Sequence, residues 1–216
     1  MQLKSLYQVY PSDSTVYEWI VRYTKAAAKD AKISNIKVGS IWIADETVLR
    51  LDQHVKTWFW DIIDSDTRFL LASHISVTRT TKDAEALMQK AWDRAQKTPR
   101  IIYTDKLAAY LDGIELAFGA DTKHKQGGPF DVKNNTNLIE RFHGTIKTRT
   151  KVMRNLRNSE TARLVMDGWL INYNFFRPHE SLKNKTPGEV AKATFPFKSW
   201  LDVVRSNHPK VQTCPK

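Results

Sequence analysis

Three acidic residues stand at positions from which they could act together on a phosphodiester bond. Asp45 lies inside an apolar run, Asp105 directly follows another such run, and Glu140 lies in a basic segment. The separations along the chain are 60 and 35 residues. Hard divalent cations take oxygen ligands such as carboxylates. Two ions about 3.5–4 Å apart activate the attacking oxygen and stabilise the leaving oxygen in phosphodiester chemistry. The three acids are therefore candidate ligands for a pair of divalent ions.

The segment around Glu140 points to a metal site next to a polyanion. Apolar residues recur at three- and four-residue steps, which predicts a helix with one buried face. Glu140, Gly144 and Lys147 form a separate stripe on that helix, because residues three and four apart share a face. Glu140 is the only acid between residues 134 and 157. The other charged residues there are all basic: Arg141, Lys147, Arg149, Lys151, Arg154 and Arg157.

A structural role for Glu140 is the alternative. Asn137 and Glu140 have the spacing of a capping box, with Asn137 at the N-cap and Glu140 at the N3 position. A carboxylate near a helix start also suits the positive end of the helix dipole. The local sequence leaves both roles open.

Strand patterns predict how the first two acids are positioned. Residues 41–51 alternate as a strand should, and Asp45 lies in the middle on the side that Ile43 and Leu49 share. A carboxylate among inward-facing apolar residues is costly unless it meets a partner or a metal. Segments 58–63 and 68–75 are predicted to form a hairpin around the turn 64–67. We assign its acids no catalytic role: Asp61, Asp64 and Asp66.

The rest of the chain predicts alternating helices and strands. Asp105 follows the predicted strand 100–104, and strand ends are common functional positions in α/β sheets. The remaining predictions are a helix over 81–95, a helix over 106–110 ended by Asp112-Gly113, edge segments at 114–118 and 121–125, a helix capped by Ser159, a loop over 174–182, and a short helix after Thr186 with proline at its first position.

An N-terminal helix is predicted from Thr15 to Lys29, with Thr15 and Glu18 in capping-box register. Its buried stripe would include Trp19, Ile20 and Tyr23, and basic residues would stay outside. Arg22 and Lys25 are the candidate DNA contacts there. A short turn followed by such a helix resembles the second helix of a helix-turn-helix. A plain amphipathic helix explains the pattern equally well.

Composition limits the classes of function. The chain has 216 residues, a net charge of +11 and a pI of about 9.7, which is typical of nucleic-acid binding. No stretch approaches the roughly 18 apolar residues of a membrane span, and no secretory signal is visible. The single Cys214 excludes an internal disulfide and a multi-cysteine zinc site. We therefore expect an intracellular protein that faces DNA or RNA.

Four motifs together resemble the DDE transposases of prokaryotic insertion sequences. They are Ile43-Ala-Asp45-Glu-Thr, Tyr103-Thr-Asp105-Lys-Leu-Ala-Ala-Tyr110, Asn137-Leu-Ile-Glu140-Arg-Phe-His143 through Lys147, and Tyr173-Asn-Phe-Phe-Arg177-Pro-His179. Thirty-four residues separate Asp105 from Glu140, and Lys147 follows seven residues later. The match runs from about residue 40 to residue 191. It is most similar to insertion-sequence family six.

The resemblance implies an α/β fold of the RNase H-like type, the mixed sheet with flanking helices found in retroviral integrase cores. It implies that Asp45, Asp105 and Glu140 are the catalytic triad and bind two Mg²⁺ or Mn²⁺ ions. It implies that Lys147 and Arg149 contact the DNA end, with Arg141 and Lys151 on the same basic helix. His143 is expected beside the site without binding metal.

The implied activity is cleavage and strand transfer at terminal inverted repeats of double-stranded DNA. Both ends and a target must be bound, which implies a homodimer or larger assembly in the prokaryotic cytoplasm, associated with the nucleoid, with no membrane partner. The expected organisation is a partial helix-turn-helix-like segment and linker over 1–36, the catalytic core with C-terminal helices over 37–194, and a tail over 195–216.

One departure leaves alternatives open. Family members usually carry a fuller N-terminal helix-turn-helix, and this chain begins inside it. A catalytically inactive or truncated DNA-binding relative is therefore one alternative, and an RNase H-type nuclease is the other. Metal binding by the triad would argue against the first, and joining of a 3′-OH end would argue against the second.

Overall fold

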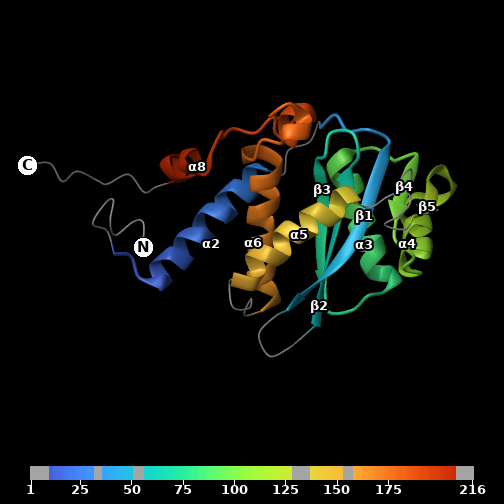
Figure 1. Cartoon of the computed structure of the whole chain (residues 1–216), viewed down its shortest axis with the longest axis horizontal. Coiled ribbons are helices and arrows are strands. Elements are labelled where there is room, and N and C mark those ends of the chain that lie inside the picture. The colour runs from blue at the N-terminus through green and yellow to red at the C-terminus, as the bar shows by residue number, and fades with distance from the viewer. Residues whose placement is uncertain (1–9, 32–35, 51–55, 128–136, 153–157, 208–216) are drawn as a thin grey trace, which may run out of the picture.

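A mixed sheet of five strands forms the centre of the protein (Figure 1). The computed structural model describes residues 10–31, 36–50, 56–127, 137–152 and 158–207. The strands run in the order β3-β2-β1-β4-β5. Strands β1, β2 and β3 pair antiparallel, whereas β4 pairs parallel to both β1 and β5. Their bounds are β1 Ile41–Arg50, β2 Lys56–Asp64, β3 Leu70–Ser76, β4 Ile101–Thr104 and β5 Lys123–Gln126.

Helices alternate with the later strands and complete the chain. The α-helices are α2 Asp13–Asp30, α3 Thr81–Ala95, α4 Ala109–Phe118, α5 Asn137–Val152, α6 Ser159–Ile171, α7 Pro187–Val190 and α8 Trp200–Asn207. Short 3-10 turns lie at Gly119–Asp121 and Glu180–Leu182, and a π-helix, η3, spans Asn172–Phe176. The predicted hairpin, the helix 81–95, the strand before Asp105 and the helix after Thr186 are confirmed.

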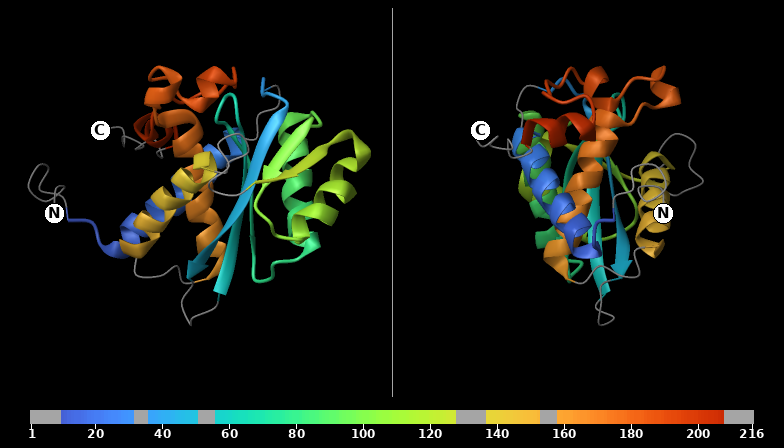
Figure 2. Two further views of the ribbon diagram at one scale, coloured as in Figure 1. Left: turned by 45° about the vertical axis from the view of Figure 1, so that its right-hand side comes forward. Right: turned by 90° about the vertical axis from the view of Figure 1, so that its left-hand side faces the viewer.

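The sheet is covered on both faces, as the two views of Figure 2 show. Successive side chains of a strand point to opposite faces. Trp42 and Ala44 of β1 accordingly pack in a core with α3 and α4. Ile43 and Leu49 pack in a second core with α5 and α6. Asp45 therefore belongs to the α5 face and Glu46 to the α3 and α4 face.

Helix α4 runs through the point where the sequence suggested a stop. Asp112-Gly113 was predicted to end a helix, and 114–118 to be edge material, but α4 continues to Phe118. A Cβ on Gly113 would lie 2.6 Å from the Ala84 Cβ and 3.0 Å from the Glu85 backbone nitrogen. Gly113 is therefore a close-packing position between α4 and α3 rather than a helix terminator.

Replacing Gly113 by alanine should destabilise the protein, because the added methyl group meets α3 backbone that is packed against the sheet. We expect the free energy of unfolding to fall by about 1–3 kcal/mol, the usual cost of overpacking. Gly144→Ala is the matched control, since its Cβ would have no neighbour within 4 Å. That change should raise stability by up to about 1 kcal/mol through helix propensity. Urea denaturation of both variants measures the difference, and equal effects would contradict the packing role.

The segment after α6 is helical where a loop was predicted. Asn174 lies in the π-helix η3 and its side chain is buried. Its Oδ1 accepts from the Leu70 backbone N–H at 2.9 Å, and its Nδ2 donates to the Leu70 carbonyl at 2.9 Å. The side-chain amide therefore pairs with the start of β3 as a neighbouring strand would, and it joins η3 to the sheet.

The N-terminal and C-terminal helices pack together. Helix α2 contacts α6 and α8, and Val203 of α8 is fully buried. Residues 200–207, predicted to be tail, are therefore part of the folded unit. The N-cap of α2 is Ser12 rather than Thr15, and its side chain accepts from the Thr15 backbone N–H. Tyr23 is buried as predicted, but Trp19 and Ile20 are exposed because α6 and α8 cover only part of the apolar stripe.

Within the residues that the structure describes, no helix is both long enough and apolar enough to cross a membrane.

Candidate active site

Two neighbouring parallel strands bring Asp45 and Asp105 together. Ile41 to Ile43 of β1 pair with Ile101 to Tyr103 of β4, and each acid follows that paired stretch by two residues. One carboxylate oxygen from each of Asp45, Glu46 and Asp105 lies within 4.8 Å of the others. The predicted meeting of Asp45 and Asp105 is therefore present in the folded chain. The donor set consists only of oxygen atoms, which suits a hard divalent cation.

Glu46 is a member of this cluster that the sequence analysis missed. It faces the opposite side of β1 from Asp45, yet both reach Asp105 because the pairing of β1 with β4 ends at Ile43. Its side chain is 1% exposed. The sequence did carry a signal, since a second acid sits next to Asp45 inside an apolar strand. Neighbouring residues of a strand point to opposite faces of the sheet, so the strand pattern alone does not indicate that Glu46 and Asp45 meet at one site.

Arg79 is a cation that contacts two acids of the cluster. It lies in the loop between β3 and α3 and forms an ion pair with Glu46. Its Nη2 also lies 3.8 Å from Asp105 Oδ2. Burial and the charge of Asp105 raise the pKa of Glu46, against the lowering effect of Arg79. Among the described residues, Glu46 Oε2 and the Tyr110 hydroxyl make no direct hydrogen bond, although both are buried.

Asp105 is held by the start of the segment that follows it. Its Oδ1 accepts from the Leu107 backbone N–H at 2.9 Å. Burial raises the pKa of Asp105, and the nearby charge of Asp45 adds to this increase. The Leu107 hydrogen bond and Arg79 oppose it. The Asp105 side chain is 40% exposed, and its Oδ2, which lies 3.8 Å from Arg79, accepts no hydrogen bond from Leu107.

His143 of α5 supports Asp45 from the other face. The strand register places Asp45 directly opposite Asp61, and like charges in such a pair repel each other. The His143 ring lies between them, with Nε2 2.8 Å from Asp61 Oδ1 and Nδ1 3.3 Å from Asp45 Oδ2. The ring therefore bridges two acids, and His143 stands beside the site as predicted. Asp61 lies inside β2, whereas Asp64 caps the turn by accepting from the Thr67 backbone N–H at 2.9 Å.

Burial and neighbouring charges set the protonation of His143 and Asp61. Burial alone would lower the pKa of His143, but Asp61 and Asp45 outweigh it and raise the pKa to about 10. Burial raises the pKa of Asp61 to about 6, against the charge and hydrogen bond of His143. At neutral pH the ring is therefore an imidazolium that links the two carboxylates.

The contact of His143 with Asp61 and Asp45 predicts a pH dependence of stability in metal-free solution. The folded state keeps the His143 proton up to about pH 10, whereas the unfolded chain loses it near the ordinary value of 6.5. The stabilisation is thus complete below pH 6.5 and is lost as pH rises towards 10. Asp61 acts in the same direction between its ordinary 3.8 and about 6. His143→Gln should remove the slope above pH 6.5 and cost about 3 kcal/mol near neutral pH, because the buried Asp61 and the partly buried Asp45 lose their shared cation.

Chemical denaturation at several pH values measures this effect. His124→Gln is the control, because burial lowers the pKa of the half-buried His124 and it does not titrate above pH 6.5. An unchanged slope in His143→Gln would show that the imidazolium does not hold the two acids together.

Glu140 lies near the cluster without joining it. Among the described residues, the group of carboxylates within 4.8 Å contains Asp45, Glu46 and Asp105 but not Glu140. Glu140 is exposed in the first turn of α5, three residues before His143. Residues three apart share a helix face, so Glu140 stands one turn from the ring that contacts Asp45. The residues before Asn137 lie outside the described part of the structure, so the capping-box role of Glu140 stays an alternative.

The predicted DNA-contacting residues fall on two helices. Arg141, Gly144 and Lys147 are exposed on α5, as is Glu140. The side chains of Arg149 and Lys151 lie outside the described part of the structure. Arg22 and Lys25 are exposed on α2, which packs on α6 and α8.

The fold is that of retroviral integrase catalytic cores, which are RNase H-like. A chain of the simian T-cell lymphotropic virus intasome bound to a PP2A regulatory subunit matches with a TM-score of 0.57 and 17% identity, covering 77% of this chain and 60% of that chain. The HTLV-2 integrase catalytic core in complex with magnesium matches with a TM-score of 0.54 and 18% identity, covering 72% of this chain and 97% of that chain. The BIV integrase catalytic core matches with a TM-score of 0.53 and 16% identity, covering 71% and 94%.

A match to a sequence-based family model shows the family of this chain. A family model described as a DDE domain, of the IS240 transposase type, matches residues 39–179, which is more than half of the chain. The chain therefore belongs to the DDE transposases of insertion sequences, as the resemblance in the sequence suggested. No protein among the curated ones matches it. Membership of this family supports a general role in DNA transposition or recombination.

Proposed function

We propose that this protein cuts the 3′ ends of a DNA element at its terminal repeats and joins them to target DNA. The observation that carries the proposal is the meeting of Asp45 and Asp105 at the ends of two parallel strands, with oxygens within 4.8 Å of each other. Family membership adds the class of substrate, which is DNA.

The residues fit a site for divalent ions. Asp45 and Asp105 would hold Mg²⁺ or Mn²⁺, and Glu140 would complete a second ion site from α5. When bound, two such ions supply an activated attacking oxygen and a stabilised leaving oxygen. The magnesium in the HTLV-2 integrase core belongs to a protein with the same fold and is consistent with this assignment.

The side chains around the acids position them for this chemistry. The imidazolium of His143 fixes Asp45 by holding it and Asp61 in one triad. The Leu107 N–H fixes Asp105 through one oxygen. Arg141 and Lys147 line the exposed face of α5, where they would hold the phosphates of the DNA end. Phosphate contacts of this kind position DNA without reading its sequence.

Two DNA ends must react together, so we propose that the active form is a homodimer or a larger assembly on double-stranded DNA. The trimeric and dimeric forms described for the HTLV-2 integrase core belong to that protein. We propose the same kind of assembly for this chain. We also propose that Arg22 and Lys25 of α2 contact DNA.

A joining assay tests the proposed activity. Labelled duplexes that carry the genomic sequence flanking the coding region would be mixed with the protein, supercoiled plasmid and Mg²⁺ or Mn²⁺. We expect labelled 3′ ends to become covalently joined to the plasmid only when the divalent ion is present. A reaction in EDTA is the control.

Two other outcomes of this assay would contradict the proposed activity. Metal-dependent cleavage without joining would indicate an RNase H-type nuclease. Binding that weakens with added salt, without any cleavage of either DNA, would indicate a non-catalytic DNA-binding relative.

A further inference from the structure

Arg79 occupies a defined place at the edge of the acidic cluster. Its guanidinium pairs with Glu46, lies 3.8 Å from Asp105 Oδ2 and stacks 4.5 Å from the centroid of the Trp58 ring. Glu46 and Trp58 thus hold the guanidinium from two directions. An arginine stacked and paired in this way is pre-organised and loses little further freedom.

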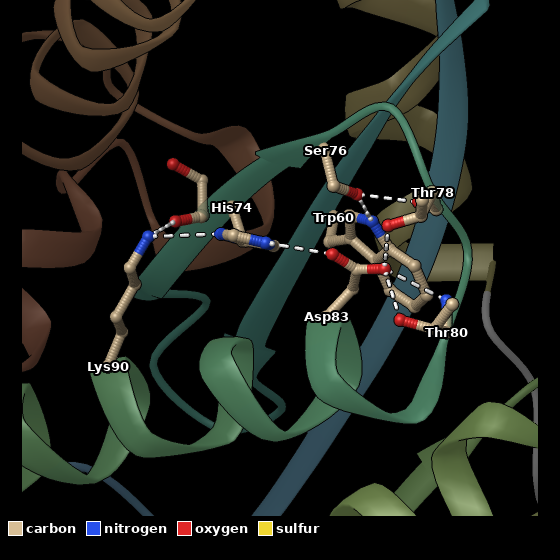
Figure 3. Close-up of polar contacts among 8 residues, drawn as sticks. Trp60, His74, Ser76, Thr78, Thr80, Asp83 and Lys90 are labelled. Carbon is tan, nitrogen blue, oxygen red and sulfur yellow. Dashed lines mark hydrogen bonds and ion pairs between the residues drawn. The ribbon is translucent and has the colours of Figure 1, made fainter.

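The loop that carries Arg79 is also fixed. The residues on either side of it, Thr78 and Thr80, both donate to Asp83 at the start of α3, as Figure 3 shows. The distances to Asp83 Oδ2 are 2.7 Å from Thr78 Oγ1, 2.8 Å from Thr80 Oγ1 and 2.9 Å from the Thr80 backbone nitrogen. His74 contacts the other Asp83 oxygen at 3.3 Å. This network anchors the loop to β3 and α3, so Arg79 is held at the site by its backbone as well.

Among the described residues, a cation contacts the acids on each face of the sheet. His143 stands between Asp45 and Asp61 on the α5 face. Arg79 stands between Glu46 and Asp105 on the α3 and α4 face. Each cation contacts one acid that is proposed to bind metal and one that the family triad does not include.

We propose that Arg79 is the resident counter-ion of the metal site, that an incoming divalent ion displaces it from Asp105, and that Glu46 is its anchor and not a metal ligand. This proposal rests on the proposed function of Asp45 and Asp105. Arg79 then sets the metal affinity of the free protein, because a cation already beside Asp105 competes with the ion. After displacement the guanidinium stays at the site, held by Glu46 and Trp58.

Two observations favour the anchor role for Glu46. One of its oxygens is already engaged by the always-charged guanidinium, and its side chain is 1% exposed whereas Asp105 is 40% exposed. The more open acid is the one that solvent-borne metal reaches. The competing role for Glu46 is that of a third ligand, through its unpaired Oε2.

Titration of Mn²⁺ into the metal-free protein, followed by calorimetry, tests Arg79 without any DNA or turnover. Arg79→Gln should bind Mn²⁺ at least about fivefold more tightly. Two unit charges about 4 Å apart repel each other by an amount that corresponds to about this factor, even with the dielectric screening of bulk water. Arg79→Lys keeps the charge and should stay near wild type. Arg79→Met removes the charge and keeps an extended side chain to pack on Trp58, so it should also bind Mn²⁺ more tightly and takes the place of the glutamine variant if that folds poorly. Arg100→Gln, an exposed arginine that precedes β4, is the control for net charge. Equal affinities of wild type and Arg79→Gln would overturn the proposal.

Glu46→Gln in both backgrounds separates anchor from ligand, because a double-mutant cycle isolates the coupling of two residues. As an anchor, Glu46 releases Arg79 onto Asp105 when it is replaced, so the loss of Mn²⁺ affinity should be larger with Arg79 present than in Arg79→Gln. A loss at least as large without Arg79 would make Glu46 a ligand and would overturn the anchor role. If wild-type protein bound no Mn²⁺, the proposed function itself would fail, and the role of Arg79 with it.

Discussion

Replacing Asp105 by asparagine is expected to lower the rate of DNA end cleavage and joining at least about a hundredfold, the scale on which a preorganised charge stabiliser contributes. Asparagine has the same size, and its Oδ1 still accepts from the Leu107 N–H that now holds Asp105. The change removes the negative charge that would hold a divalent ion. Stability should change little, because a half-buried acid whose pKa is raised by burial and by Asp45 becomes neutral.

The measurement is the joining assay together with thermal unfolding. Asp112→Asn makes the same change of charge at an exposed position in the first turn of α4 and should leave joining unchanged. A variant of Asp105 that unfolds at the wild-type temperature and still joins DNA would exclude Asp105 from the chemistry.

The sheet could be predicted from sequence because its signals are local. Alternation along residues 41–51 and the turn acids Asp64 and Asp66 define a hairpin without reference to distant residues. The apolar run before Asp105 defines β4 in the same way. The order of these strands and helices along the chain predicts that Asp45 and Asp105 lie close together, and the structure places them so.

The errors in the fold have a common physical cause, which is tertiary contact. Gly113 reads as a helix terminator, yet the close approach of α3 requires a residue without Cβ there. Asn174 reads as a loop residue, yet it pairs with the backbone of Leu70 about a hundred residues away. The exposed Trp19 and Ile20 read as core, because periodicity shows an apolar stripe but not how much of it a neighbour covers.

The meeting of Asp45 and Asp105 and the place of His143 beside them could be predicted from the sequence, whereas the places of Glu46 and Arg79 could not. Register decides that Asp61 faces Asp45, and a one-residue slip would place it on the other face. That register places both acids beside His143 of α5, and together they raise the pKa of its ring. Arg79 lies in a loop with no motif of its own, and its place depends on Asp83 holding both neighbours. Cations that neutralise a site come from whichever element packs nearby, so spacing along the chain does not reveal them.

The variant Glu140→Gln tests whether Glu140 is the third metal-binding acid beside Asp45 and Asp105. Glutamine keeps the size and helix propensity of the side chain and removes the charge. If Glu140 completes a second ion site, metal-dependent cleavage and joining should fall at least about a hundredfold, while binding to duplex DNA persists or tightens through the added net positive charge.

Stability distinguishes a ligand from a dipole-stabilising acid. Glu160→Gln is the matched control, since Glu160 is likewise an exposed first-turn glutamate, at the start of α6. Loss of a favourable charge near a helix start costs about 0.3–1 kcal/mol, so both variants should show a similar small change in unfolding. Only Glu140→Gln should lose joining. If Glu140→Gln instead unfolds more readily than Glu160→Gln and keeps its activity, Glu140 serves the helix start and the DDE triad of this chain lacks its third member.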